Sequence, residues 1–353
     1  MGNVEAVLEV KDLWVSFRVR GKRLQAIRGV DLSLYPGQTL AIVGESGSGK
    51  SVLTRAFSGM LEENGRIDRG QILLRRRGEV TDLTAIKRER QWQALRGGVI
   101  ASVFQDPMTA LNPTRTIGQQ ILSAVRLHRK CAKKEAKRQA VEIMEKVGIP
   151  EPEKRFGDYP FQYSGGMRQR IVIAIALACQ PEILICDEPT TALDVTVQAQ
   201  ILELIKKLQL EQGFAVVFIT HDLGVVANVA DRVAVLYAGQ VVELGTAEEI
   251  FYDPRHPYTW ALLGSLPQLA RRGERLYAIA GSPPSLYKKI QGDAFAPRNP
   301  HRLKIDSLKM PPLFSLTPTH FVRSWLLDPR APRLEKPERI QNLHRKLQEE
   351  LSG

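Results

Sequence analysis

The sequence predicts an α/β protein with a parallel sheet at its core, covered by helices on both faces. The first observation is an alternation in the centre of the chain, where helical patterns at 165–180 and 195–212 are followed by the short apolar segments 182–186 and 214–219. Apolar strands without polar alternation, joined by helices, are typical of parallel sheets. The second is the apolar segment 40–43, which runs into a glycine-rich loop and then into a helical pattern.

Strands dominate the N-terminal part of the chain. We expect them at residues 7–17, 24–34 and 39–43. A helical pattern follows from residue 51 to residue 60, and residues 65–101 return to short segments broken by glycine and charge. We expect this last stretch to be a small, mostly antiparallel insert.

A helical subdomain is expected at about 110–166. Its clearest signal lies within 117–147, where four apolar residues fall at i, i+3, i+4 and i+7 and make one stripe: Ala140, Ile143, Met144 and Val147. Gly148 and Pro150 then provide a stop for the helix.

The last hundred residues differ in character from the rest. Residues 233–236 and 240–244 resemble a hairpin, and many of the 21 prolines then lie between Pro254 and Pro337. We therefore expect one α/β domain at 1–250 and an irregular C-terminal extension at 251–353 that ends in a helix near 337–351. The sequence has no internal repeat, so it carries one copy of the core.

Composition excludes several classes of protein. The 353 residues are 43% hydrophobic and 25% charged, which argues against collagen-like, mucin-like and wholly disordered chains. The longest apolar run, Ile171 to Cys179, has nine residues, whereas a membrane crossing needs roughly 20. Because the N-terminus also lacks the pattern of a signal peptide, we expect a soluble protein on the cytoplasmic side.

The net charge and the cysteines do not identify a single kind of partner. The excess of 50 Lys and Arg over 38 Asp and Glu, 50 − 38 = +12, admits nucleic acid, anionic lipid or an anionic small ligand. The basic clusters at 75–77, 87–90 and 126–138 are not interleaved with aromatic residues, so solvated faces are the favoured interpretation. The three cysteines, Cys131, Cys179 and Cys186, have no metal-ligand spacing and are expected to be reduced thiols.

The strongest motif is the glycine-rich loop. Residues 44–51 read Gly-Glu-Ser-Gly-Ser-Gly-Lys-Ser and fit G-x-x-x-x-G-K-[ST] in full, between a strand and a helix. Its glycines allow backbone N–H groups to surround an anion, and the helix adds its positive end; a chance glycine-rich turn is the alternative. Lys50 supplies charge for the β and γ phosphates, and the Ser51 hydroxyl is a ligand for Mg²⁺. The predicted nucleotide-binding residues in this loop are Gly44, Glu45, Ser46, Gly47, Ser48, Gly49, Lys50, Ser51 and Val52.

Polar side chains follow the central strands. Asp187 and Glu188 end an apolar strand, where α/β sheets bind ligands. We predict that Asp187 holds Mg²⁺ and that Glu188 orients or deprotonates the attacking water, although Asp187 alone could also cap a helix. His221 follows the next apolar strand. A neutral imidazole there can sense a γ-phosphate, although a lone histidine is more often a packed loop residue.

Five motifs, in order across residues 6 to about 250, resemble the ATP-binding cassette (ABC) family of transport ATPases, which are P-loop NTPases. Tyr163-Ser-Gly-Gly-Met-Arg-Gln-Arg170 resembles the family signature, with Met167 where many members have Gln. Val103-Phe-Gln105 resembles the Q-loop and Thr191-Ala-Leu-Asp194 the D-loop, while Phe17 stands where members stack an aromatic ring on adenine. The resemblance implies catalytic roles for Glu188, His221 and Gln105, and Mg²⁺ ligation by Ser51, Gln105 and Asp187.

The signature also has a physical interpretation of its own. Gly165 and Gly166 expose backbone amides at the start of a helix, next to the Ser164 hydroxyl, which favours binding of an anion; a simple capped helix is the alternative. The family resemblance implies that Ser164, Gly165, Gly166 and Met167 act on ATP held by a second cassette. It implies as partners a second, distinct ABC ATPase subunit, two transmembrane permease chains and an extracellular binding protein, with no nucleic acid.

A narrower resemblance points to the oligopeptide and dipeptide importers. It rests on Phe104 to Pro113, Ser164 to Arg170, Asp187 to Val195, His256-Pro-Tyr-Thr259 and the run from Gly281 to Leu286. In its absence of cysteine, the extension is similar to that of the oligopeptide importers of Gram-positive bacteria in particular. Many members carry four cysteines in the extension that resemble iron–sulfur ligands, but Gly292 to Asn299 contains none, so we expect ATP and Mg²⁺ and no iron–sulfur cluster.

The predicted function is the ATPase subunit of a bacterial oligopeptide importer, at the cytoplasmic face of the membrane. A dipeptide, nickel or other solute importer is an alternative, and a nucleic-acid-linked ABC ATPase a more distant one. A metabolic P-loop kinase does not account for the signature.

Overall fold

The computed structural model describes residues 5–129, 131–191, 193–266, 279–337 and 340–341. The chain forms two compact units, each assembled from segments that are not consecutive. The first unit contains the segment up to Val7, Leu34–Thr39 and Ala85–Ile219. The second unit contains Leu8–Ser33, Leu40–Thr84 and the described residues from Thr220 onward.

Three parallel strands form the sheet of the first unit. They are β6 (Ile100–Val103), β7 (Ile183–Asp187) and β8 (Ala215–Ile219), in the order β6-β7-β8. Every residue of β8 is buried, as are the first four of β7, which is why their sequences show no polar alternation. The predicted parallel sheet is confirmed, and the predicted helix 195–212 between β7 and β8 is α8 (Val195–Gln212).

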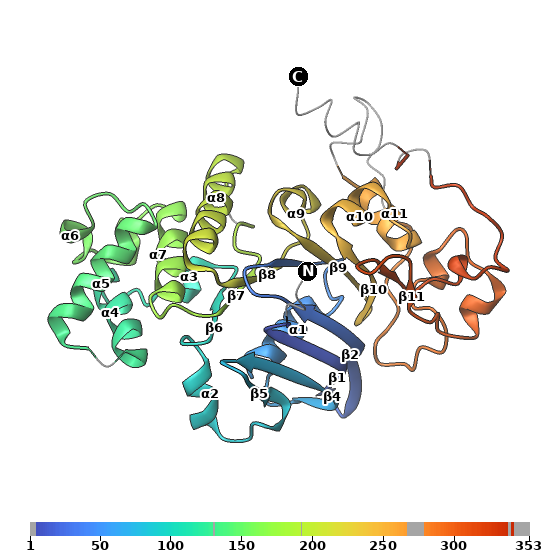
Figure 1. Ribbon diagram of the computed structural model, residues 1–353, viewed down its shortest axis with the longest axis horizontal. Helices are drawn as coiled ribbons and strands as arrows, with labels where there is room; N and C mark the ends of the chain where they lie inside the picture. The colour runs from blue at the N-terminus through green and yellow to red at the C-terminus, as the bar shows by residue number, and fades with distance from the viewer. Residues whose placement is uncertain (1–4, 130, 192, 267–278, 338–339, 342–353) are drawn as a thin grey trace. The chain divides into compact units, whose positions relative to one another are not determined.

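Helices make up most of the rest of the first unit (Figure 1). They are α2 (Glu89–Leu95), α3 (Pro107–Ala110), α4 (Ile117–His128), α5 (Lys133–Lys146), α6 (Pro152–Arg155) and α7 (Gly165–Leu177). The sequence predicted one helical stretch at 117–147, but the structure has two helices, because Arg129 and Ala132 have extended backbones. The predicted apolar stripe of α5 is confirmed as buried: Ala140, Ile143, Met144 and Val147.

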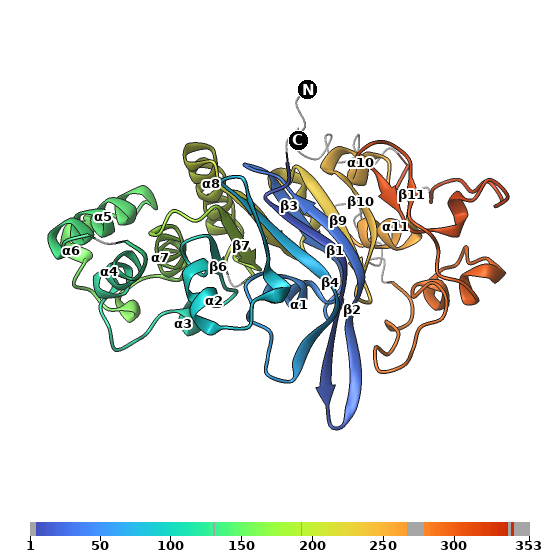
Figure 2. The ribbon, with the colours of Figure 1, turned by 60° about the horizontal axis from the view of Figure 1, so that its bottom comes forward.

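An antiparallel sheet lies in the second unit (Figure 2). Its strands are β1 (Leu8–Val19), β2 (Lys22–Leu34), β4 (Gly65–Arg76) and β5 (Glu79–Asp82), in the order β2-β1-β4-β5, and β4 runs antiparallel to both β1 and β5. The insert predicted at 65–101 is therefore correct as far as β5. Beyond β5 it was wrong, because α2 is a short helix anchored by the buried Trp92, and β6 is a parallel strand.

The second unit also contains the strand that precedes the glycine-rich loop. That strand, β3 (Thr39–Val43), pairs in parallel with β9 (Arg232–Tyr237), which forms the predicted hairpin with β10 (Gln240–Thr246). Two short strands continue the antiparallel pairing: β12 (Phe321–Val322) and β11 (Phe314–Ser315). The helices are α1 (Lys50–Phe57), α9 (Leu223–Val229), α10 (Ala247–Tyr252) and α11 (Pro257–Gly264).

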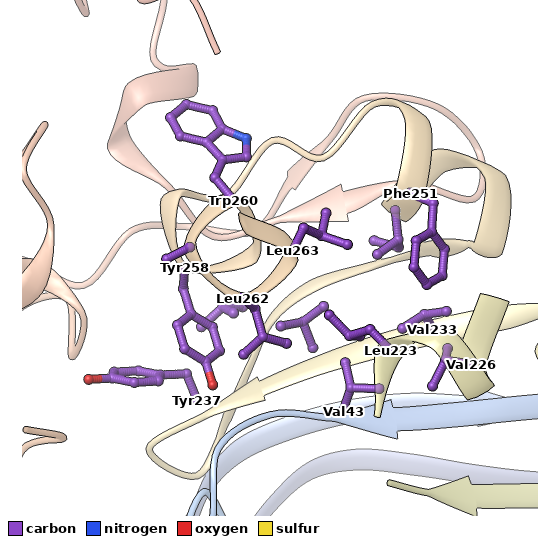
Figure 3. Packing of buried hydrophobic residues seen from close by; sticks show 14 of the residues in the cluster. Val43, Leu223, Val226, Val233, Tyr237, Phe251, Tyr258, Trp260, Leu262 and Leu263 are labelled. Atoms are coloured by element: carbon purple, nitrogen blue, oxygen red, sulfur yellow. The ribbon is translucent and has the colours of Figure 1, made fainter. Parts of the chain in front are cut away.

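The C-terminal extension shares the core of the second unit. All eight residues of α11 are buried, and its Tyr258 and Leu263 belong to the same apolar cluster as Val43 of β3 and Val233 of β9 (Figure 3). Burial of this kind stabilises by about 25 cal/mol per Å² of apolar surface, so this part of the extension is integral to the fold. The helix predicted near 337–351 lies largely outside the described residues.

Two further predictions concern membrane segments and cysteines. Within the described parts of the chain, no helix has both the length and the apolar character that a bilayer crossing requires. The three cysteines are free thiols, with Cys179 and Cys186 buried. Burial raises the pKa of the Cys179 thiol to about 11 and that of Cys186 well above its usual range, so both are protonated.

Candidate functional site

The glycine-rich loop, residues 44–49, connects the fully buried strand β3 to the start of α1. Glycine is required at both ends of the loop. A Cβ on Gly44 (φ +148°) would lie 2.1 Å from the carbonyl oxygen of Leu236, and one on Gly49 (φ +108°) would lie 2.9 Å from that of Ala26. The strand, the loop and the helix thus have the order that the motif predicted.

The Lys50 side chain is hydrogen-bonded to the backbone of this loop. This side chain is buried, and Nζ donates to the carbonyl oxygens of Gly44 at 2.8 Å and Glu45 at 3.0 Å. Ser51 and Val52 follow in the first turn of α1 and are half-buried. Because the N–H groups of a first helical turn have no partner within the helix, this end of α1 favours an anion.

The loop has the chemistry that a polyphosphate and Mg²⁺ require. Ser46 and Gly47 are exposed at its crest, and Gly47 has a positive φ of +77° that turns the backbone. The buried hydroxyl of Ser48 lacks a hydrogen-bond partner among the described residues. Left-handed turns of this kind allow successive N–H groups to face one anion. The hydroxyl of Ser51 is a hard oxygen donor of the type that Mg²⁺ prefers.

Phe17 lies near the end of β1 and is half-buried. It pairs with Gly65 of β4, and a Cβ on Gly65 would lie 2.6 Å from the ring. Glycine at position 65 therefore gives the aromatic ring room to lie across β4.

The predicted catalytic groups of the first unit meet at the carboxyl end of β7. Asp187 is the last residue of β7, and Glu188 follows with a left-handed backbone (φ +48°). The Glu188 N–H donates to the carbonyl oxygen of Ile219 at 2.9 Å. Its Oε2 accepts from Gln105 Nε2 and from Thr191 Oγ1, both at 3.0 Å. Two of these partners, Ile219 and Gln105, are distant in the sequence. A left-handed non-glycine residue with such partners is held in its conformation by its surroundings.

The register of the sheet explains why Gln105 reaches Glu188. Val103 of β6 is paired with Cys186 of β7 in a parallel register. The residues that follow the two strands therefore leave the sheet at the same edge. Because the Gln105 side chain donates through Nε2, its side-chain oxygen can act as a metal ligand. The role of Thr191 was missed from the sequence, although the residue lies in the D-loop motif.

Helix capping settles one alternative left open by the sequence. Asp187 does not cap a helix, since the next helix is α8 and its N-cap is Asp194, which accepts from the Val197 N–H at 2.9 Å. Ala192 of the D-loop lies outside the described residues. In the second unit, His221 is exposed just before α9, and Asp222 is the N-cap of that helix.

The signature forms the N-terminus of α7. Ser164 is the N-cap and accepts from the Met167 N–H at 3.3 Å, so the helix is capped as the simpler interpretation predicted. The two glycines differ in their surroundings. Gly165 is exposed, and a Cβ there would have no neighbour closer than 3.8 Å, whereas a Cβ on Gly166 would lie 2.6 Å from Cγ1 of Val197.

Sequence reasoning missed two residues of the extension that contact the glycine-rich loop. The Glu45 N–H donates to the hydroxyl of Tyr258, and the Glu45 carboxylate accepts from the guanidinium of Arg298. Both residues lie in segments that the sequence analysis singled out, 256–259 and 292–299, without assigning them a role.

Comparison with known proteins places this geometry in context. Residues 27–191 match the protein family described as ABC transporter, and residues 242–305 match the family described as oligopeptide/dipeptide transporter, C-terminal region. The chain is 59% identical to the oligopeptide transport ATP-binding protein AmiE of Streptococcus pneumoniae over 98% of its length and 96% of that protein. It is 56% identical to the oligopeptide transport ATP-binding protein OppD of Bacillus subtilis, with the same coverage. It is 53% identical to the dipeptide transport ATP-binding protein DppD of Lactococcus lactis, over 95% of each chain.

Solved structures of ATP-binding cassettes are also similar to this chain. The chain is similar to the ATP-binding cassette MJ0796, solved as a dimer in a post-hydrolysis state with ADP and Pi, with a TM-score of 0.60 and 26% identity. The similarity covers 68% of this chain and 98% of the cassette.

Proposed function

This chain belongs to the ABC transporter family, and on that premise we propose that it is the ATP-hydrolysing subunit of a bacterial oligopeptide importer. The observation that carries the proposal is the similarity to oligopeptide transport ATP-binding proteins over 98% of the chain, including the extension. A dipeptide importer is the second candidate, because a dipeptide transport protein is also similar at 53% identity.

ATP binding is assigned to the glycine-rich loop. The loop amides and Lys50 bind the phosphates, and Phe17 stacks on the adenine. The proposed ligands of Mg²⁺ are the Ser51 hydroxyl, the Asp187 carboxylate and the side-chain oxygen of Gln105. All three offer hard oxygen atoms. When bound, Mg²⁺ neutralises the charge that develops on the phosphates.

Hydrolysis is assigned to Glu188. Its carboxylate accepts the proton of the attacking water or orients that water, and it is held in place by Gln105 and Thr191. Gln105 is hydrogen-bonded to this carboxylate. We propose that it couples nucleotide binding and hydrolysis to the permease through the exposed loop that follows β6. His221 is proposed to contact the γ-phosphate.

We propose that the signature completes the ATP site of a second cassette. The exposure of Ser164 and Gly165 at the start of α7 supports this assignment, as does the dimeric state in which the similar cassette MJ0796 was solved. ATP that binds between two cassettes favours their closed state, and hydrolysis removes that preference. Asp194, the cap of α8, belongs to the proposed D-loop of the same interface.

The proposed assembly contains a second, distinct ATPase subunit, two permease chains and an extracellular peptide-binding protein, with this chain at the cytoplasmic membrane face. The family and the names of the relatives support a permease partner. Nucleic acid is not a proposed partner.

Two variants test the proposal. Lys50→Ala removes the charge for the phosphates and is expected to abolish MgATP binding measured by calorimetry on the full chain, while Lys206→Ala, on the exposed face of α8, serves as the charge-matched control. Glu188→Gln is expected to keep MgATP affinity and to slow hydrolysis at its site roughly 10²- to 10⁴-fold in the assembled importer. Unchanged MgATP affinity in Lys50→Ala, or normal turnover with Glu188→Gln, contradicts the assignment.

A further inference from the structure

Two segments of the C-terminal extension bring side chains to the glycine-rich loop, and both converge on Glu45. The Tyr258 hydroxyl, from α11, accepts from the Glu45 N–H at 2.8 Å. Arg298 donates through Nη1 and Nη2 to Oε2 and Oε1 of Glu45, at 2.6 Å and 3.0 Å. All three residues belong to the second unit.

The Arg298 guanidinium is itself fixed. Its side chain is 4% exposed, Nε donates to the carbonyl oxygen of Ala280 at 2.9 Å, and Nη2 donates to that of Ile279 at 3.2 Å. Nη1 also contacts the Tyr237 hydroxyl at 3.3 Å. The Glu45 side chain is 26% exposed, so only the guanidinium of this pair is buried. A bidentate guanidinium–carboxylate pair has a defined geometry as well as a strong attraction. The hydrogen bonds with Glu45 hold the pKa of Arg298 above its usual range, so the guanidinium stays charged.

Glu45 is the residue through which such a contact reaches the rest of the loop. Its carbonyl oxygen accepts from Lys50 Nζ at 3.0 Å and from the Ser48 N–H at 3.2 Å. The N–H, the carbonyl oxygen and the side chain of Glu45 are therefore all engaged, the first and last by the extension. A shift of this peptide would move the two groups on which the assigned phosphate binding depends, the loop amides and the Lys50 ammonium.

We propose that Arg298 is a positioning residue for nucleotide binding, which acts through Glu45 and makes the affinity for MgATP depend on the C-terminal extension. Tyr258 does the same through the Glu45 N–H. This inference rests on the proposed function, since it concerns the same loop and the same ligand. It assigns to the extension a role in nucleotide binding in addition to its burial in the core.

The test compares MgATP affinity and stability in full-length variants. Arg298→Ala is expected to raise the Kd for MgATP roughly three- to tenfold, because Glu45 loses its fixed partner. Arg330→Ala is the matched control, since Arg330 lies in the same extension, is 85% exposed and pairs with Asp328. It is expected to leave the Kd unchanged. In the assembled importer, Arg298→Ala is expected to raise the KM for ATP by the same factor with kcat within about twofold, because the contact acts on the phosphate loop and not on the groups assigned to hydrolysis.

A double-mutant cycle separates this role from a merely structural one. If Arg298 acts through Glu45, adding Arg298→Ala to Glu45→Gln changes the Kd by much less than Arg298→Ala does alone. Fully additive changes in Kd, or a lower melting temperature with an unchanged Kd, overturn the proposal. If Arg298→Ala does not fold, Tyr258→Phe decides, because it keeps the ring contacts with Tyr237 and Phe295 and removes only the hydroxyl. An unchanged Kd in Tyr258→Phe then overturns the proposal.

The same measurements separate the two levels of the argument. A wild-type chain that does not bind MgATP refutes the proposed function and this inference with it. A wild-type chain that binds MgATP, and loses it in Lys50→Ala but not in Arg298→Ala or Tyr258→Phe, refutes only the inference.

Discussion

Gly166 of the signature offers a quantitative test of local packing in the first unit. A Cβ at this position would lie 2.6 Å from Cγ1 and 3.7 Å from Cγ2 of Val197 on α8. Non-bonded carbon atoms are most stable about 3.5–4.0 Å apart, so Gly166→Ala creates an overlap of about 1 Å with Cγ1. Valine in a helix has one strongly preferred rotamer, and Val197 therefore cannot turn away at low cost.

The magnitude follows from two opposing effects. Overpacking of this size costs about 1–3 kcal/mol, and replacing glycine by alanine within a helix returns about 0.5–1 kcal/mol. Gly166→Ala is thus expected to lower the free energy of unfolding by about 1 kcal/mol. In a Val197→Ala background the overlap disappears, and the same substitution is expected to be neutral or stabilising.

Urea unfolding of the isolated chain, followed by far-ultraviolet circular dichroism, measures both effects. The matched control is Gly165→Ala, where the nearest atom to a Cβ is 3.8 Å away, so no overlap arises. The reasoning is refuted if Gly166→Ala is as stable as the wild type, or if its effect is the same with valine and with alanine at position 197.

The remaining predictions concern the shared ATP site and the response to pH. Gly165→Asp is expected to leave the isolated chain folded and to lower ATP hydrolysis by the assembled importer at least about twofold, because its carboxylate places bulk and negative charge against the phosphates at one of two shared sites; undiminished hydrolysis contradicts a signature that acts across the interface. Burial raises the pKa of Asp293 to about 6, against the opposing charge of Arg28, so the folded chain holds this proton more tightly than the unfolded chain. The free energy of unfolding of the wild type relative to Asp293→Asn is therefore expected to fall as the pH rises from about 4 to about 7, by up to about 3 kcal/mol, and then to level off. Urea unfolding of both proteins across this range measures the difference, and a constant or rising difference rules out the assigned cause.

Local patterns were sufficient to predict the elements of the core. Continuous apolar character identified β7 and β8, and the periodic stripe identified α5, because burial on both faces or on one face leaves a direct trace in the sequence. The helix α2 was missed because it is short and has a single buried anchor, Trp92. The break between α4 and α5 was missed because neither glycine nor proline marks it.

Contacts within the candidate site were predictable only where strand register determines them. Gln105 and Glu188 follow neighbouring parallel strands, and their proximity follows from the order of the sheet. Tyr258 and Arg298 lie more than 200 residues from Glu45 in the chain. Their approach depends on how the extension packs on the core, which neither periodicity nor spacing encodes.

The phosphate loop is thus a tertiary structure as much as a sequence motif. The Gly239 N–H, from the turn between β9 and β10, donates to the carbonyl oxygen of Ser48 at 2.8 Å, and the Gly239 carbonyl accepts from the Arg28 N–H at 2.8 Å. With the contacts of the extension on Glu45, the loop is held from two directions by segments distant in the sequence. Changes in these supporting segments are therefore expected to alter nucleotide affinity even where the loop residues themselves are unchanged.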